Sequence, residues 1–311
     1  MLRLVVAPVE QGLRLDAFLA AVTNISRRRA RALIAAGLVV RNGRPVRVQS
    51  RAVAAGDVVD LFGDDDGSLQ VRPTPSGGVR FLHEDPWLLV VDKPAGVLSQ
   101  PAAGRGRDEL SLDQQVTLAL ADRDGRRPFL RLVHRLDRLT SGAVLFARNP
   151  QATKALAGAW AQGKVERLYL ALVEGEPGVE RLTMAEPVAR AQDHPWRFRV
   201  APAGAPARTE IEVLHRFAPG RALVRCRLLS GRTHQVRVHL AAAGHPVLGD
   251  TLYGARRGPG VARPMLHAHL LDLPHPRTGE PLRVTAPVPA DFRALLPREA
   301  LEAIGEPETE S

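Results

Sequence analysis

The residues with the clearest chemical potential lie in one short polar segment, Val-His-Arg-Leu-Asp-Arg-Leu-Thr-Ser-Gly at 133–142. It interrupts two apolar, β-prone runs at 128–132 and 143–147, so we expect a loop between two strands. Within it, Asp137 stands between Arg135 and Arg138. Nearby positive charge keeps a carboxylate ionised and fixes its direction, and such a group can serve as a nucleophile or a general base. The alternative is an ordinary ion pair on a surface loop.

A second polar cluster, Ser-Gly-Arg-Thr-His-Gln-Val-Arg-Val-His at 230–239, follows a half-apolar strand. Thr233 is a suitable N-cap for a helix that runs to about residue 243. Arg232 comes just before this helix, and Arg237 and His239 lie within it. The amides of a helix N-terminus together with an arginine favour an anion. That anion is either a phosphate or Asp137 itself, and an ordinary helix start with scattered basic residues is the alternative.

Other residue types limit the chemistry. The sequence contains neither G-x-G-x-x-G nor a P-loop, so no nucleotide cofactor is predicted. The single cysteine, Cys226, excludes an internal disulfide. The ten histidines lack the spacing of known metal-binding motifs, so we expect neither a metal nor any other cofactor. Tyr169, in an apolar run at 165–173, is an ordinary core residue unless it faces the same cleft as Asp137.

The charge of the chain favours a polyanionic partner. The net charge is +10 at pH 7, and only three of the 43 basic residues are lysines. Arginine offers a bidentate fork for phosphate and a flat face for bases, so this bias suits nucleic acid, although a GC-rich genome would produce it too. Placement supports the first explanation, because residues 1–60 hold ten arginines against four acidic residues, whereas residues 297–311 hold one arginine against five glutamates.

The first sixty residues predict a small docking module. They contain two short helices at 13–22 and 27–36, a hairpin around Asn42-Gly43 and a strand at 58–61. Ser26 is a suitable cap for the second helix. Its apolar residues mark one face and Arg27, Arg28 and Arg31 another. Such a module is better suited to docking than to chemistry.

The whole chain is predicted to contain four segments. Residues 1–62 form the basic module, residues 63–78 a flexible linker rich in Gly, Pro, Ser and Asp, residues 79–296 the catalytic domain and residues 297–311 an acidic tail. In 79–296 strands dominate and are often joined by hairpins, which predicts an α+β fold on a mixed, largely antiparallel sheet. We expect a cytoplasmic protein, because the sequence has neither a run of about 20 apolar residues nor a signal peptide.

Two resemblances connect these observations. Residues 12–61 resemble an S4-type RNA-binding domain through Arg14-Leu15-Asp16, Ser26-Arg27, Leu33-Ile34, Gly37–Val40, Asn42-Gly43 and Gly56–Val59. Residues 79–292 resemble the RluA family of RNA pseudouridine synthases through His134–Asp137, Thr140–Gly142, Asp92–Gly96, Arg167–Ala171, Gly231–His239, Gly244–Pro246, Gly249-Asp250, Tyr253-Gly254 and Leu266–Ala268. The resemblance implies the pseudouridine synthase fold, with a central cleft.

The second resemblance also implies residue roles. Asp137 would be the essential carboxylate of an enzyme that breaks the glycosidic bond of uridine, rotates the base and forms a bond from C5. It would attack the base or the sugar C1′, or assist bond breaking. Tyr169 would stack on the uracil and is a candidate for removing the C5 proton, and Arg232 would pair with Asp137. Predicted substrate-binding residues are Arg135, which would fill the gap left by the base, and Arg138, Thr140, His234, Arg237, Arg27, Arg28 and Arg31.

The implied substrate is RNA, most often large-subunit ribosomal RNA in chains with an S4-like module, with transfer RNA as the alternative. A non-catalytic RNA-binding or ribosome-assembly protein is the competing hypothesis, and the presence of Asp137, Tyr169 and Arg232 argues against it. We expect a monomer without an obligate protein partner and without membrane contact. Leu139, Arg167 and Gln100 depart from the residues common in the family, but none of them replaces a proposed catalytic group.

Overall fold

The structure is a computed structural model that describes residues 2–23, 25–35, 38–46, 48, 51–61, 79–101, 110–194, 196–218, 220–256 and 261–305. Its contacts divide the chain into two compact units. The first comprises residues 1–79 and 97–130, and the second comprises residues 80–96 and 131–311. The prediction places residues 97–130 in the catalytic domain, whereas the contacts place them in the first unit. No helix in the described ranges is long and apolar enough to cross a bilayer.

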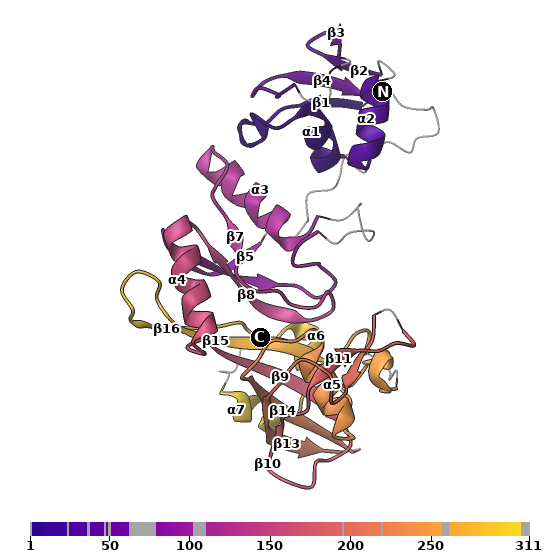
Figure 1. The fold of residues 1–311 in the computed structure, drawn as a ribbon, viewed down its shortest axis with the longest axis vertical. Coiled ribbons are helices and arrows are strands. Elements are labelled where there is room, and N and C mark those ends of the chain that lie inside the picture. The colour runs from indigo at the N-terminus through magenta and orange to yellow at the C-terminus, as the bar shows by residue number, and fades with distance from the viewer. Residues whose placement is uncertain are drawn as a thin grey trace. The chain divides into compact units, whose positions relative to one another are not determined.

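The first unit contains a small sheet and three helices (Figure 1). Its strands β1 (Leu2–Val5), β2 (Val39–Arg41), β3 (Arg44–Pro45) and β4 (Val58–Leu61) are ordered β1-β4-β2-β3 and pair antiparallel. Its helices are α1 (Leu15–Val22), α2 (Arg27–Ala35) and α3 (Leu112–Asp124), with a 3-10 turn, η1, at Pro8–Glu10. The predicted cap is confirmed, because Ser26 Oγ accepts the amide of Arg29 at 3.1 Å.

The amphipathic pattern predicted for α2 is also confirmed. Ala30, Leu33 and Ile34 are buried in a core with residues of α1 and the small sheet. Arg27, Arg28 and Arg31 reach solvent on the other face. Burial of the apolar stripe therefore fixes which arginines of this helix are accessible.

The second unit is built on a ten-stranded sheet of order β10-β13-β14-β9-β15-β8-β6-β5, with β16 added to β15 and β7 to β8. The strands are β5 (Arg80–Glu84), β6 (Leu88–Lys93), β7 (Arg131–Leu132), β8 (Ser141–Ala147), β9 (Glu166–Glu174), β10 (Arg181–Met184), β13 (Thr209–Phe217), β14 (Arg221–Leu228), β15 (Leu266–Pro274) and β16 (Pro281–Thr285). In the described residues only β8 and β15 pair parallel, so the predicted α+β class with a mixed, largely antiparallel sheet is confirmed.

Helices cover parts of this sheet (Figure 1). Helix α4 (Pro150–Ala161) is capped by Asn149, a residue type that commonly caps helices, and packs Ala152 and Leu156 against β6, β8 and β15. Helices α6 (Ala290–Arg293) and α7 (Arg298–Ile304) pack in a second cluster against β9 and β14. Helix α5 (Gln235–Ala242), the 3-10 turn η2 (Thr251–Tyr253) and the hairpin of β11 (Val188–Arg190) and β12 (Phe198–Val200) complete the unit.

Some predictions need correction. Residues 298–304, assigned to an acidic tail, form α7, and Ala300 and Ile304 are buried in the core, because the apolar positions of this segment share one helical face. Strands β1, β10, β11 and β12 were not predicted. The whole predicted linker, residues 63–78, and the end of the tail, residues 306–311, lie outside the described residues.

Gly142 lies where the polar loop enters the sheet, at a position that requires glycine. It lies in β8 opposite Ala268 of β15 and Lys93 of β6, with a φ of +118°. A Cβ atom on Gly142 would lie 2.2 Å from the carbonyl oxygen of Ala268. Only glycine allows this backbone angle together with so close an approach of two strands.

We therefore predict that Gly142→Ala lowers the free energy of unfolding of the second unit by roughly 3 kcal/mol or more, from backbone strain and overpacking together. All three tryptophans, Trp87, Trp160 and Trp196, belong to that unit, so denaturant unfolding followed by tryptophan fluorescence reports on it. Gly163→Ala is the matched control, because Gly163 also has a positive φ, whereas a Cβ atom added there would meet no other atom within 4 Å. Equal losses for the two variants would contradict this role of Gly142.

Candidate active site

Asp137 lies in the loop between β7 and β8, as the sequence predicts. A turn closes the end of this loop, where the amide of Thr140 donates to the carbonyl of Asp137 at 3.1 Å. Leu136 and Thr140 are buried on either side, while the Asp137 side chain keeps 25% of its surface exposed. The loop thus anchors its apolar and hydroxyl residues and leaves one carboxylate accessible.

Arg237 of α5 holds that carboxylate. Its Nη1 donates to Asp137 Oδ2 at 3.1 Å, and its Nε and Nη2 donate to the two oxygens of Asp250 at 2.6 and 2.9 Å. The Asp250 side chain is 1% exposed and that of Arg237 only 9%. Burial opposes the charge on Arg237, but hydrogen bonds and charge from Asp250 and Asp137 raise the pKa of this guanidinium. Arg237 is therefore a permanent cation whose direction Asp250 fixes.

The predicted partner Arg232 does not make this ion pair. Its side chain is exposed, and its Nε donates to the carbonyl of Pro206 at 2.9 Å. The physical reason is the path of the chain into α5, where His234, with the left-handed φ of 57°, occupies the N-cap position in place of the predicted Thr233 and makes no capping bond with its side chain. Arg237, in the first turn of the helix, points to Asp137 instead. Arg232 still lines the pocket in which Asp137 lies.

His234 and Tyr253 form a second link to the carboxylate. His234 Nε2 lies 3.7 Å from Asp137 Oδ2, and its Nδ1 lies 2.8 Å from the hydroxyl of Tyr253. That hydroxyl accepts the amide of Phe198 at 3.0 Å and can donate its own hydrogen to Nδ1, which leaves the imidazole hydrogen on Nε2, facing Asp137. Burial lowers the pKa of His234, although the charge of Asp137 opposes the shift, so the ring is neutral at pH 7.

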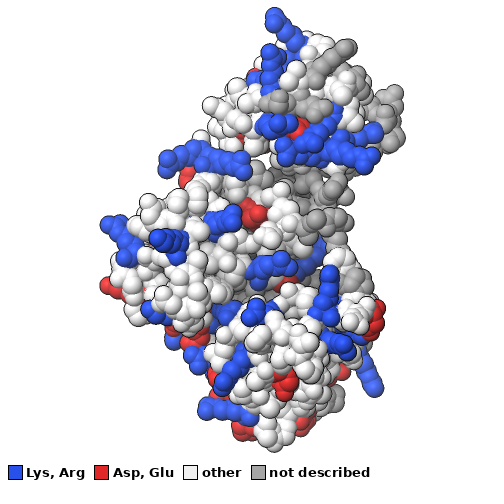
Figure 2. Space-filling view, in the orientation of Figure 1, with Lys and Arg blue, Asp and Glu red and all other residues white. Residues whose placement is uncertain are grey.

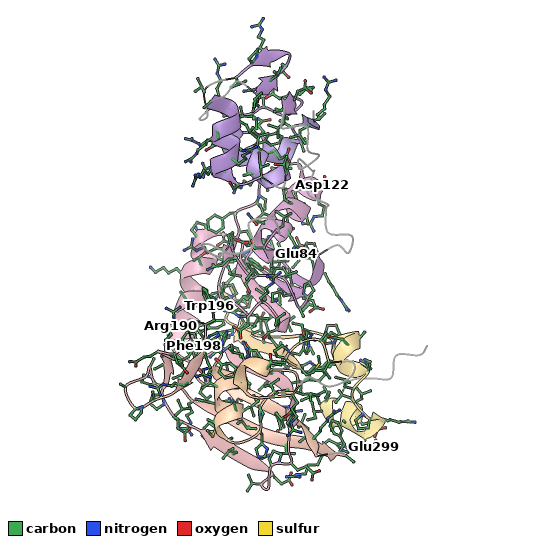
Figure 3. The ribbon with its side chains drawn as sticks, turned by 90° about the vertical axis from the view of Figure 1, so that its right-hand side faces the viewer. Glu84, Asp122, Arg190, Trp196, Phe198 and Glu299 are labelled. Carbon is green, nitrogen blue, oxygen red and sulfur yellow. The ribbon has the colours of Figure 1, made fainter. Side chains whose placement is uncertain are left out.

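The β11–β12 hairpin supplies Phe198 to this network. Phe198 pairs with Arg190 across the hairpin, where both are labelled in Figure 3. Its ring meets the His234 ring edge-on at 5.6 Å between centroids. Trp196, just before β12, is 46% exposed. The hairpin thus connects an exposed surface to the hydrogen bonds around Asp137.

Tyr169 faces the same pocket as Asp137, which was the condition for treating it as more than a core residue. It lies in β9 between Cys226 of β14 and Ala268 of β15 and is 9% exposed. Burial raises the pKa of Tyr169 to about 12; the charge of Arg167 opposes the shift and that of Asp137 adds to it. The phenol is therefore protonated at neutral pH and lines the same pocket as the Asp137 carboxylate.

Lys93, at the end of β6, stabilises the Asp137 loop through hydrogen bonds made inside the second unit. It is fully buried, and its Nζ donates to the carbonyls of Pro94 at 2.9 Å and Arg138 at 3.0 Å. Arg138 Nε in turn donates a hydrogen bond to the carbonyl of Gly96 at 2.7 Å. Burial lowers the pKa of Lys93 to about 7, although the negative charge of Asp137 opposes the shift. The upstream loop 92–96 and the Asp137 loop are thereby joined.

The predicted site residues therefore separate into three groups. The Asp137 pocket contains Arg135, Asp137, Thr140, Tyr169, Arg232, His234 and Arg237. Arg138 is instead tied to the upstream loop, and Arg27, Arg28 and Arg31 lie in the first unit. Sequence reasoning missed Lys93, Asp250 and Tyr253 as parts of the site, although each falls in a segment that carries the family resemblance. No group of three possible metal ligands occurs in the described ranges.

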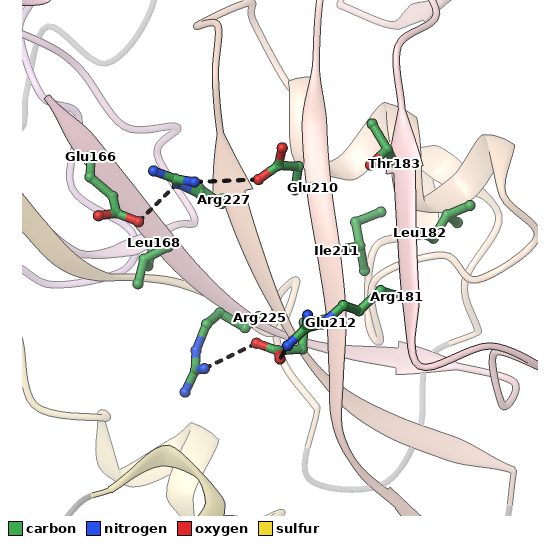
Figure 4. A pocket seen from close by; sticks show the side chains of 10 residues that line it. All are labelled: Glu166, Leu168, Arg181, Leu182, Thr183, Glu210, Ile211, Glu212, Arg225 and Arg227. Atoms are coloured by element: carbon green, nitrogen blue, oxygen red, sulfur yellow. Dashed lines mark hydrogen bonds and ion pairs between the residues drawn. The ribbon is translucent and has the colours of Figure 1, made fainter. Parts of the chain in front are cut away.

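A larger groove of about 470 Å³ lies elsewhere on the sheet, over β9, β10, β13 and β14 (Figure 4). The Asp137 pocket measures about 60 Å³, so size alone would favour the groove. However, the six charged residues of the groove pair with one another, in the chains Glu166–Arg227–Glu210 and Arg181–Glu212–Arg225. The groove shares no lining residue with the smaller pocket. Chemistry therefore selects the pocket of Asp137.

Comparison with known proteins identifies the family of this chain. The family model described as RNA pseudouridylate synthase matches residues 87–242. A protein of Chloroflexus aurantiacus named as an uncharacterized RNA pseudouridine synthase is 38% identical over 94% of this chain and 92% of its own length. The chain belongs to the RNA pseudouridine synthases. The predicted family and enzyme class are therefore confirmed.

Further matches support the architecture of this pseudouridine synthase. The S4 domain model matches residues 13–59, which confirms the predicted S4-like module and RNA as a partner. The ribosomal large subunit pseudouridine synthase D of Nitrosomonas europaea is 37% identical over 75% of this chain and 68% of its own. The structure of human RNA pseudouridylate synthase domain containing 1 has a TM-score of 0.57 at 27% identity and covers 75% of this chain and 97% of its own. The predicted pseudouridine synthase fold is thus confirmed.

Removing Arg237 should cost the synthase much more stability than removing Arg232. Arg237→Met leaves the buried Asp250 without a partner, so we expect a loss of about 3–5 kcal/mol in the free energy of unfolding. Arg232→Met, the matched control, removes one exposed side chain and should change it by less than about 0.5 kcal/mol. Denaturant unfolding followed by tryptophan fluorescence measures both. Similar values for the two variants would show that the Arg237–Asp250 pair is not a structural anchor.

Lys93 should make stability depend on pH. Its pKa is about 7 in the folded protein and 10.5 when unperturbed, so between these values the unfolded chain binds the additional proton. The free energy of unfolding should rise from pH 7 towards pH 10, by up to about 1.4 kcal/mol per pH unit from this group. Subtracting the same curve for Lys93→Met isolates the contribution from those of other groups. Parallel curves for the two proteins would exclude it.

Proposed function

We propose that this synthase isomerises specific uridines of large-subunit ribosomal RNA, with Asp137 as its essential carboxylate. The observation that carries the proposal is the placement of Asp137 in one pocket with Tyr169, against the buried cation Arg237. The similarity to a protein named for the ribosomal large subunit supports the choice of RNA. Transfer RNA is the second candidate.

The proposed reaction needs a nucleotide outside its stack. An atom of a stacked base is not accessible to a side chain, so the target uridine must be flipped into the pocket, at a cost of a few kcal/mol. The aromatic ring of Tyr169 can replace part of the stacking that the uracil loses. Arg135, which lines the same pocket, is the proposed substitute for the displaced base within the RNA. Neither role has a counterpart in the larger groove over β9, β10, β13 and β14, where the charged side chains are paired.

The chemistry is an isomerisation without gain or loss of electrons. The bond from C1′ to N1 breaks, the uracil rotates, a bond from C1′ to C5 forms, and the C5 proton leaves while N1 gains one. Asp137 attacks C1′ or the base, or assists the bond breaking. Arg237 and the Nε2–H of His234 keep its carboxylate directed into the pocket. With a pKa raised to about 12, Tyr169 is protonated and acts as an aromatic surface. Its hydroxyl is the candidate acceptor of the C5 proton, with its own proton passing to the uracil N1, which gains one in the reaction.

Asp137→Asn should abolish the isomerisation while leaving the fold intact, because the amide has the same shape but no nucleophilic charge. We expect release of tritium from ribosomal RNA labelled at uridine C5 to fall by roughly 10³-fold or more. Asp272→Asn is the matched control, since Asp272 pairs with Arg283 between β15 and β16, away from the pocket. If wild type and Asp137→Asn release tritium equally, the catalytic role of Asp137 is wrong. The same assay on labelled transfer RNA decides between the two substrate classes.

The absence of an obligate protein partner, the monomeric state and the cytoplasmic location stay predictions. Size-exclusion chromatography with light scattering tests the first two. Cell fractionation tests the third.

A further inference from the structure

The N-terminal unit contains a buried carboxylate under three arginines. Asp16, in the first turn of α1, has no exposed side-chain surface. Its oxygens accept from Arg14 Nε at 3.0 Å, Arg27 Nε at 3.0 Å and Arg31 Nε at 2.7 Å. Arg27 and Arg31 come from α2, one helical turn apart, so one acidic residue gathers guanidinium groups from two elements.

The energetics of this cluster favour a fixed arrangement. A carboxylate taken out of water must be fully paired to be tolerated. Burial alone would raise the pKa of Asp16, but hydrogen bonds from Arg14, Arg31 and Arg27 lower it well below its usual range. The carboxylate is therefore charged at any physiological pH, and each guanidinium is bound at a defined point.

The same three arginines remain available to a ligand. Their side chains are 46%, 49% and 47% exposed for Arg14, Arg27 and Arg31. Arg27 and Arg31 each give Nε–H to Asp16, so these two contacts do not require the hydrogens on their terminal nitrogens. The cluster carries three positive charges against one negative, and basic side chains gather on this unit (Figure 2).

We propose that Asp16 is a positioning residue that holds Arg14, Arg27 and Arg31 as one preformed surface for the phosphates of an RNA backbone. This inference rests on the proposed function in taking RNA as the ligand. A free arginine side chain loses rotamer entropy when it binds a phosphate, whereas one already held by Asp16 loses little. The terminal N–H groups of an arginine match the oxygens of a phosphate. Contacts to phosphates position a protein along a nucleic acid without recognising its sequence.

Asp16→Asn changes the affinity for RNA in opposite directions under two hypotheses, simple electrostatics and the proposed positioning. Asp16→Asn removes a negative charge from a basic surface. If the arginines acted only through total charge, RNA would bind more tightly to this variant. If Asp16 positions them, RNA should bind more weakly despite the added positive charge.

The experiment compares Asp16→Asn with Asp60→Asn in the full-length protein. Asp60 lies in β4 of the same unit and pairs with Arg3, so its substitution makes the same charge change without releasing α2. Fluorescence anisotropy with a short fluorescein-labelled RNA hairpin, at one fixed salt concentration, gives each dissociation constant. We expect about tenfold weaker binding for Asp16→Asn, from the ordering of three arginine side chains. Asp60→Asn should bind as tightly as wild type or slightly more tightly.

Two further measurements keep the test decisive. In a variant with Arg14, Arg27 and Arg31 all changed to Ala, the effect of Asp16→Asn on RNA affinity should disappear, whereas a general folding defect would persist. In the wild-type protein, the Nε–H NMR signals of Arg27 and Arg31 should exchange slowly with water. This measurement needs no variant, so it decides the matter even if Asp16→Asn fails to fold, and rapid exchange of both signals would overturn the proposal.

Failure of this inference is distinguishable from failure of the proposed function. Binding of Asp16→Asn as tight as that of Asp60→Asn would overturn the positioning role, while tritium release by wild type would still support the isomerase. Absence of tritium release by wild type would overturn the proposed function and leave the binding comparison valid. If both hold, Asp16→Asn should raise the KM for RNA by a larger factor than it lowers kcat.

Discussion

The catalytic unit depends on one guanidinium shared by two carboxylates. Arg237 is bound on one side by the buried Asp250 and on the other by the accessible Asp137. A single Arg–Asp pair on a surface would be mobile and weak. Here Asp250 fixes the arginine, and the arginine then fixes the second carboxylate, so the direction of Asp137 follows from a pair that solvent hardly reaches. The position of α5 beside the sheet is a condition for both contacts.

The sequence allowed the reactive loop, the tyrosine strand, the basic helix and most elements to be predicted, because each has a local signal. Loop 133–142 breaks two apolar runs, and Ser26 and Asn149 cap the helices that follow them. The partner of Asp137 had no such signal. Arg232 and Arg237 are both close to a helix start, and the choice between them depends on the left-handed backbone of His234 and on Asp250, which is 13 residues away from Arg237. Contacts at that separation are set by tertiary packing, which periodicity does not encode.

Composition alone also overstates the charge available for RNA. Many arginines are paired within the structure, as Arg148 is with Glu84, Arg216 with Glu180 and Arg263 with Asp291. These pairs stabilise strands and loops rather than bind phosphate. In the groove over β9, β10, β13 and β14, all three arginines form ion pairs with the three glutamates of the same groove. Placement and pairing, rather than the net charge of +10, therefore decide which basic residues can meet a nucleic acid.

Each of the two units contains a cluster of arginine and aspartate side chains, but the ratio of arginine to aspartate is opposite in the two clusters. In the catalytic unit two carboxylates share one arginine, so the cluster has surplus negative charge, and the surplus lies on the exposed member, Asp137. In the N-terminal unit one carboxylate serves three arginines, so the surplus is positive and lies on half-exposed guanidinium groups. In both, the buried partner of opposite sign restricts the motion of the exposed groups. A cluster with excess carboxylate can supply a nucleophile or a base, whereas a cluster with excess guanidinium is suited to binding anions. The ratio of the two residue types within each cluster thus fits the two proposed roles, catalysis at Asp137 and RNA docking at Arg14, Arg27 and Arg31.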